Sequence, residues 1–129
     1  MAAGFDYLIP FGGITLRCEY YHQGTGESDK TLYNSARFLD GRLMGENYLF
    51  VNLDWPFEDY CNAAVTGFIN LDDGSGLVMP TFGCEVYTDF QIIAGGIVFF
   101  GDSGTEFNGE FLNIDFTEPQ VFVRCKVSF

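Results

Sequence analysis

His22 is the single histidine of the chain, so any Ser-His-Asp or Cys-His centre would have to use it. It ends a predicted strand, before Gly24-Thr25-Gly26, and no Gly-x-Ser-x-Gly turn presents a nucleophile. The glycines there and at Gly101-Asp102-Ser103-Gly104 lack the lysine and hydroxyl that complete a phosphate-binding loop. These residues indicate ordinary turns and a surface histidine.

Acidic residues offer two further kinds of chemistry. The turn Asn70-Leu71-Asp72-Asp73-Gly74 collects oxygen ligands, but not in the spacing of a calcium loop, so calcium is not favoured there. Because the chain has 18 Asp and Glu, pairs of carboxylates arise by chance, and we expect no enzyme and no cofactor. Carboxylates that could pair for glycoside hydrolysis are Glu85, Asp89, Glu106, Glu110 and Asp115.

Four widely spaced cysteines, with no Cys-x-x-Cys, do not match a zinc site. They are Cys18, Cys61, Cys84 and Cys125. Cys18 and Cys125 alternate with apolar residues on predicted strands, which is typical of buried thiols. We expect all four to be reduced.

The elements that would position these residues are short strands. Sixteen glycines and four prolines separate short apolar segments, a pattern typical of an all-β domain. Strands are expected at 5–9, 14–22, 48–55, 68–71, 77–79, 84–93, 97–100, 110–116 and 120–129, with a tight hairpin at Asp40-Gly41. We predict a single β-rich domain over 1–129, an antiparallel β-sandwich, jelly roll or small barrel.

At most one short helix is expected, over residues 56–67. Pro56 suits a first helical position, and Gly67 suits the end. Phe57, Cys61 and Ala64 recur at helical spacing between them.

Charge limits the partners. A net charge of −12 disfavours nucleic acid and anionic membrane surfaces. The start lacks a cationic segment followed by an apolar run, so we expect no secretory signal and a virion or cytoplasmic location. The alternating last nine residues resemble the final strand of an outer-membrane barrel. However, the expected strands are few and mostly short, and we expect no membrane role.

Aromatic residues indicate a protein partner. Tyr20 and Tyr21 are adjacent in a strand and must point to opposite faces, so some aromatics lie outward. The segment 1–11 is expected to be a subunit-contacting arm, with Phe5, Tyr7 and Phe11 as anchors.

We therefore predict a non-catalytic structural or assembly protein, a virion or phage component such as a capsid decoration, cement or tail protein. It would act through a protein partner or a homo-oligomer. The alternatives are a carbohydrate- or ligand-binding lectin-like β-sandwich and a small carboxylate-dependent hydrolase.

Overall fold

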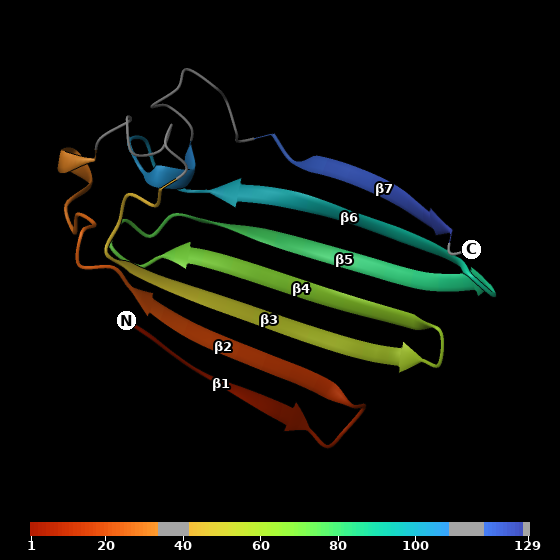
Figure 1. Cartoon of the computed structure of the whole chain (residues 1–129). Coiled ribbons are helices and arrows are strands. Elements are labelled where there is room, and N and C mark those ends of the chain that lie inside the picture. The colour runs from red at the N-terminus through yellow and green to blue at the C-terminus, as the bar shows by residue number, and fades with distance from the viewer. Residues whose placement is uncertain (34–41, 109–117, 128–129) are drawn as a thin grey trace.

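The computed structural model describes residues 1–33, 42–108 and 118–127, and most of them belong to one antiparallel sheet (Figure 1). Its strands are β1 (Ala2–Ile9), β2 (Ile14–His22), β3 (Asn47–Glu58), β4 (Cys61–Asn70), β5 (Gly76–Tyr87), β6 (Phe90–Phe100) and β7 (Gln120–Val127). Two short 3-10 helices, η1 (Lys30–Leu32) and η2 (Glu106–Asn108), lie in the connections. The predicted all-β class is confirmed. The described strands form one open sheet, however, and not two packed layers or a closed barrel.

The sheet is a simple meander in which each strand pairs with the next, leaving β1 and β7 at the edges. Three turns of two to four residues, at 10–13, 59–60 and 88–89, lie at one end of the sheet, which we call the short-turn end. Three longer connections, 23–46, 71–75 and 101–119, start and finish at the opposite end, the loop end, where their described residues lie (Figure 1). The two ends of the sheet are therefore built differently.

Strand registers place alternate residues of all seven strands on one uncharged surface, which we call the apolar face. Apart from His22 and Asn47 at the loop end, it consists of Ala3, Phe5, Tyr7, Ile9, Ile14, Leu16, Cys18, Tyr20, Leu49, Val51, Leu53, Trp55, Phe57, Cys61, Ala63, Val65, Gly67, Ile69, Gly76, Val78, Pro80, Phe82, Cys84, Phe90, Ile92, Ala94, Gly96, Val98, Phe100, Val121, Val123, Cys125 and Val127.

The opposite surface, the polar face, carries the charged residues of the strands. They are Asp6, Arg17, Glu19, Asp54, Glu85, Arg124 and Lys126, and a further one, Glu58, lies beside the β3–β4 turn. Charge is thus sorted by face along the whole sheet.

A small core lies on the polar face at the loop end, where the connections fold over the sheet. Tyr48 and Met44 are buried there. The Tyr48 ring stacks on Phe68 with centroids 5.2 Å apart, and Phe107 meets Phe68 edge-on at 6.0 Å. This packing anchors η2 to the sheet.

The helix predicted at 56–67 is wrong, because these residues form the end of β3, a turn and most of β4. Ala63, Val65 and Gly67 lie on one face of β4 and pair with strands on both sides. That pairing outweighs the helical spacing. Pro56 is accommodated beside a bulge, a usual position for proline in a sheet.

The single strand predicted at 84–93 is also wrong, because a turn at Thr88-Asp89 divides it. Asp89 adopts a φ of 68°, which aspartate tolerates in turns. Conversely, Gly95-Gly96 does not separate strands but lies within β6. A Cβ at Gly95 would lie 2.6 Å from the Phe122 ring, so glycine is needed there for close packing.

The expectation of four reduced cysteines is wrong, because Cys61 and Cys84 form a disulfide. They lie directly opposite each other in β4 and β5, with Cα atoms 4.2 Å apart. Cys18 and Cys125 are free, as expected. Cys18 is half-buried and Cys125 exposed, so Cys125 is not the core thiol that its alternation indicated.

Two predicted features lie outside the described residues, namely the hairpin at Asp40-Gly41 and the strand at 110–116. Among the described residues, no helix has the length and apolar character needed to cross a membrane.

Candidate functional site

Glu106 is the most buried acid of the described chain and lies at the loop end, 2% exposed. Its Oε1 accepts a hydrogen bond from the Met44 amide at 2.8 Å. Its Oε2 accepts from the Tyr48 hydroxyl at 2.6 Å and from Asn70 Nδ2 at 2.8 Å. The carboxylate therefore ties β3, β4 and the 23–46 connection to η2.

Burial also changes the titration of this cluster. Loss of hydration raises the pKa of Glu106, although its three hydrogen-bond donors act in the opposite direction. Burial likewise raises the pKa of Tyr33, whose hydroxyl accepts from Asn70 Nδ2 at 2.9 Å. Because both carboxylate oxygens already bind protein donors, we interpret Glu106 as a structural acid.

The acidic turn considered for calcium is engaged in the same way. Asp72 Oδ2 accepts from the amides of Glu46 at 2.6 Å and Asn47 at 2.8 Å. Asp73 binds the Ser75 amide at 2.8 Å through Oδ1 and the Glu106 amide at 2.8 Å through Oδ2. No group of three His, Cys, Asp or Glu in the described part of the chain is arranged to hold a metal ion.

Of the carboxylates considered for hydrolysis, Glu85 and Asp89 line one small open depression, together with Phe90, Gln91 and Lys126. Glu85 pairs with Gln91 near the short-turn end, and Asp89 lies in the turn itself. Glu106 lies at the opposite end of the sheet. Glu110 and Asp115 are outside the described residues. Among the described carboxylates of this set, the structure therefore brings together only Glu85 and Asp89, beside Lys126 at an open depression.

His22 also has a local role. Its Nδ1 lies 3.1 Å from Asn47 Oδ1, and Asn47 Nδ2 donates to Asp72 Oδ1 at 2.7 Å. These contacts link the ends of β2 and β3 to the acidic turn. The imidazole is one member of the polar network at the loop end.

The largest exposed feature is the apolar face. An aromatic cluster lies toward the short-turn end, where Trp55 and Phe57 have ring centroids 5.3 Å apart and Phe57 stacks on Phe82 at 5.7 Å. Trp55 is 46% exposed. Val65, 46% exposed, lies in the middle of the face, and Val123, 68% exposed, lies in the same row of residues as Phe82. No layer of the described chain covers this surface.

Of the three predicted anchors, Phe5 and Tyr7 lie at the β1 edge of this face, and Phe11 lies in the β1–β2 turn. Phe5 is 58% exposed, Tyr7 56% and Phe11 88%. Residues 2–9 are paired with β2 along their whole length, so the segment is an edge strand in this structure, and its contact with a partner stays a prediction.

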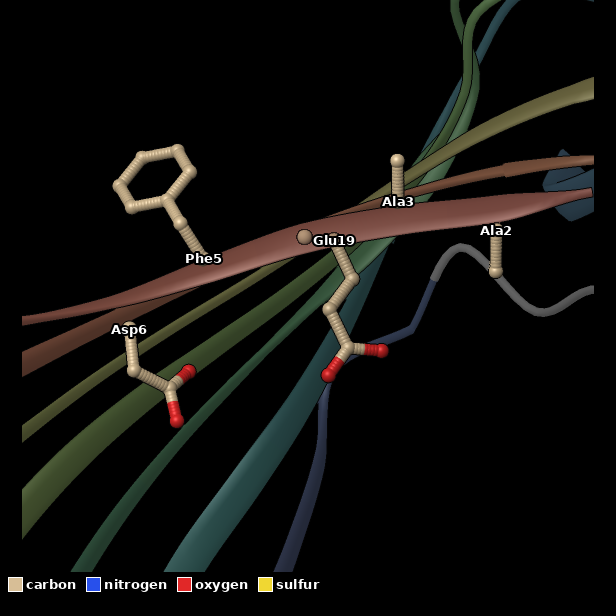
Figure 2. A pocket seen from close by; sticks show the side chains of 6 residues that line it. Ala2, Ala3, Phe5, Asp6 and Glu19 are labelled. Atoms are coloured by element: carbon tan, nitrogen blue, oxygen red, sulfur yellow. The ribbon is translucent and has the colours of Figure 1, made fainter.

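Figure 2 shows the sorting of side chains at this edge. Phe5 and Ala3 point to one side of the sheet, whereas Asp6 and Glu19 point to the other. All four line a shallow depression along the β1 edge. On that polar side Arg17 Nε donates to Asp6 Oδ1 at 2.9 Å.

Sequence reasoning missed that the apolar alternation of all seven strands coincides on one face. The alternation of apolar residues could be seen within each strand. To predict that the apolar sides form one surface, the order and register of the strands were needed as well. Comparison with protein-family models, curated proteins and solved structures finds no match to this chain.

Proposed function

We propose that this chain is a non-catalytic structural protein that is embedded in a membrane. In this role its sheet spans a lipid bilayer, with the apolar face against hydrocarbon and the polar face against water. The observation that carries the proposal is the separation of charge between the faces. The chain has a net charge of −12, yet no Asp, Glu, Lys or Arg is among the residues of the apolar face.

Strand dimensions support this setting. The seven strands have 8 to 12 residues. A tilted strand needs about 9–11 residues to cross the hydrocarbon of a bilayer. Short turns at one end and longer connections at the other are the usual arrangement of sheets that cross membranes.

The position of the aromatic residues favours lipid over a protein partner. In protein interfaces, aromatic anchors gather at the centre, and hydrogen bonds accompany them. Here Trp55, Phe57 and Phe82 lie toward the short-turn border of the apolar face. From β2 to β7 the middle rows of this face carry no aromatic side chain, and only the edge strand β1 places aromatic residues there, Phe5 and Tyr7. Aromatic belts at the border of an aliphatic band are typical of a membrane–water interface.

The size of the face also matters. Seven strands about 4.8 Å apart and about nine residues long give an area of roughly 900 Å². The largest apolar patch on a soluble monomer is about 300–600 Å². We therefore infer that other molecules cover the apolar face. Lipid hydrocarbon suits this face, because it requires no hydrogen-bonding groups.

Two expectations from the sequence change under this proposal. The argument against membranes used the net charge of the whole chain, but the described acids lie on the polar face, in turns and in connections, away from lipid tails. The Cys61–Cys84 disulfide supports an oxidising compartment such as a cell surface, in place of the cytoplasm. The expected assembly role is kept, but with lipid as the neighbour of the apolar face. The virion origin stays a prediction.

The test uses Trp55, the single tryptophan of the chain. The protein is folded into phosphatidylcholine vesicles with and without bromine on the acyl chains. We expect brominated lipid to quench Trp55 fluorescence. Val65→Lys, in the middle of the apolar face, should weaken folding into vesicles by about 2–4 kcal/mol, because it places an ammonium group in hydrocarbon.

Ala64→Lys is the matched control, since it adds the same charge one residue away, on the polar face opposite Asp54. Its free energy of folding into vesicles should equal that of the parent protein. Val123→Lys repeats the test in another strand. Unquenched Trp55, or equal effects of the lysines at 64 and 65, would contradict the proposal. A lipid-free dimer that buries the apolar face would favour the protein-partner alternative instead.

A further inference from the structure

Charged and polar side chains of the polar face lie at the same height along the strands as the aliphatic middle of the apolar face. Arg17 pairs with Asp6 in β1 and with Asn52 in β3, and Asn52 pairs with Thr66 in β4. Each of these residues alternates with apolar-face residues of its own strand. At this height the sheet is therefore charged on one side and apolar on the other.

These side chains belong to a continuous polar strip that runs along β1 to β4. From the short-turn end toward the loop end, the polar strip consists of Asn62, Asp54, Thr15, Thr66, Asn52, Arg17, Asp6 and Glu19. Asn52 Nδ2 donates a hydrogen bond to Thr66 Oγ1 at 2.9 Å, and Asn62 Nδ2 donates to Asp54 Oδ2 at 3.4 Å. Beyond β4 the row of Thr66 continues with Met79, so the strip keeps to the first four strands.

In the membrane-embedded role, the polar strip needs water beside it. The Arg17 and Asp6 side chains are 50% and 56% exposed even though they form a salt bridge. Charged side chains in hydrocarbon are costly, and ionisable residues at membrane depth usually face a protein interior or a water-filled cavity. Because the strands cross the whole hydrocarbon layer and the strip follows them, water beside it would extend from one membrane surface to the other.

The polar strip stays open where it reaches the loop end. The small core at that end packs on Phe68 of β4, whereas Glu19 of β2 is exposed. Asp6 and Glu19 point to the same side of the sheet (Figure 2), and both line the shallow depression along β1. The way past the loop-end core therefore lies beside β1 and β2, at Glu19.

Charge along the polar strip favours cations. Arg17 neutralises Asp6, whereas Asp54 and Glu19 form no salt bridge with any described residue. At the short-turn end acids outnumber bases, namely Glu58, Asp59, Glu85 and Asp89 against Arg124 and Lys126. A water-filled space lined mainly by negative charge concentrates cations and repels anions.

We propose, resting on the membrane-embedded function above, that the polar strip borders a water-filled passage for small inorganic cations such as potassium. Asp54 and Glu19 attract the cation along this passage, and the Arg17–Asp6 pair adds no net charge. The protein then has a transport function in addition to its structural one.

The first experiment measures ionic current through the full chain in a planar phosphatidylcholine bilayer that separates unequal concentrations of KCl. We expect a current whose reversal potential is displaced toward that of potassium and away from that of chloride. Asp54→Asn removes one charge at nearly constant size and should reduce this displacement, whereas Asp54→Glu should retain more of it. The absence of current, or a displacement toward chloride, would overturn the proposal.

The second experiment tests which face water reaches, in a protein whose free Cys18 and Cys125 are replaced by alanine. Asn52→Cys lies in the polar strip, and Val51→Cys is the matched control one residue away on the apolar face. In vesicles, a water-soluble trimethylammonium thiosulfonate should modify Asn52→Cys at least about tenfold faster than Val51→Cys, because the charged reagent is excluded from hydrocarbon.

Modification of Asn52→Cys should also reduce the current, because it places a bulky cation in the passage. Thr66→Cys repeats the test at a second position of the polar strip, should Asn52→Cys fail to fold. Equal rates of modification on the two faces would overturn the proposal, as would a current that modification in the polar strip leaves unchanged.

The Trp55 quenching assay is run on the same variants in vesicles, which separates the two proposals. Quenched Trp55 without ionic current leaves the membrane role standing and removes the passage. Unquenched Trp55 removes the membrane role and the passage with it.

Discussion

At the scale of single residues, Glu106 is the described acid whose environment differs most from water. It is buried under the loop-end connections and accepts three hydrogen bonds. Such a group specifies one arrangement of the surrounding segments, since a displaced connection would leave it unpaired. Its neighbours Tyr48 and Asn70 are as deeply buried, and both donate hydrogen bonds to Glu106 Oε2.

The raised pKa of Glu106 leads to a pH prediction. The folded protein holds this proton more tightly than the unfolded chain does. Its contribution to stability is therefore complete below the unfolded pKa of about 4.3 and is lost as the pH rises through the raised folded value. Thermal unfolding of the parent and of Glu106→Gln, measured from pH 4 to pH 8, should show the variant gaining relative to the parent as the pH rises.

The comparison between the two proteins cancels the titration of the other acids. Glu27→Gln, at a half-buried position of the 23–46 connection, provides a control for removing one carboxylate. A melting-temperature difference between parent and Glu106→Gln that stays constant across this pH range would contradict the prediction.

At the scale of elements, the β4–β5 hairpin is joined twice, by the turn at 71–75 and by the disulfide near its other end. The turn could be recognised from Asp72, Asp73 and Gly74, and Gly74 indeed has a φ of 72°. The disulfide could not, because 23 residues separate its cysteines and only the register places them opposite each other.

Mass spectrometry checks this pairing. Alkylation of the unfolded, unreduced protein should add two labels, at Cys18 and Cys125, and reduction should raise the number to four. Cys61→Ala with Cys84→Ala should lower the free energy of unfolding by about 3 kcal/mol, since the bridge closes a loop of about two dozen residues. Four labels without reduction would show that the pairing is wrong.

At the scale of the whole molecule, the alternation of seven strands yields one uncharged surface and one charged surface. The free thiol of Cys125 is a reporter for this difference, because it is exposed and lies on the apolar face. Its surroundings would change from water to hydrocarbon when the sheet enters a bilayer.

We expect a charged alkylating reagent to label Cys125 in lipid-free protein but only slowly after folding into phosphatidylcholine vesicles. An uncharged, lipid-soluble maleimide should label it in both states. Gln120→Cys in a Cys125→Ala background, on the polar face of the same strand, is the control that stays accessible to the charged reagent. Equal labelling of Cys125 by the charged reagent in both states would argue against a lipid-facing position.

Sequence alone determined the all-β class and several element bounds. β2 spans the predicted residues 14–22, and the turns at Pro10–Gly13 and near Asp72 lie where they were expected. These features are local, because proline, glycine and strict alternation act within a few residues. Local spacing failed at 56–67, where a helical and an alternating pattern overlap and pairing with neighbouring strands favours the strand.

Only the tertiary structure decided the order and register of the strands, and with them the disulfide, the burial of Glu106 and the continuity of the apolar face. Each depends on residues that are distant in the sequence, such as Tyr48 and Glu106 or Cys61 and Cys84. A shift of one residue in any register would move a whole strand's apolar side chains to the polar face. Alternation within a strand shows that it has two unlike sides, whereas the register across seven strands decides that the like sides form one surface.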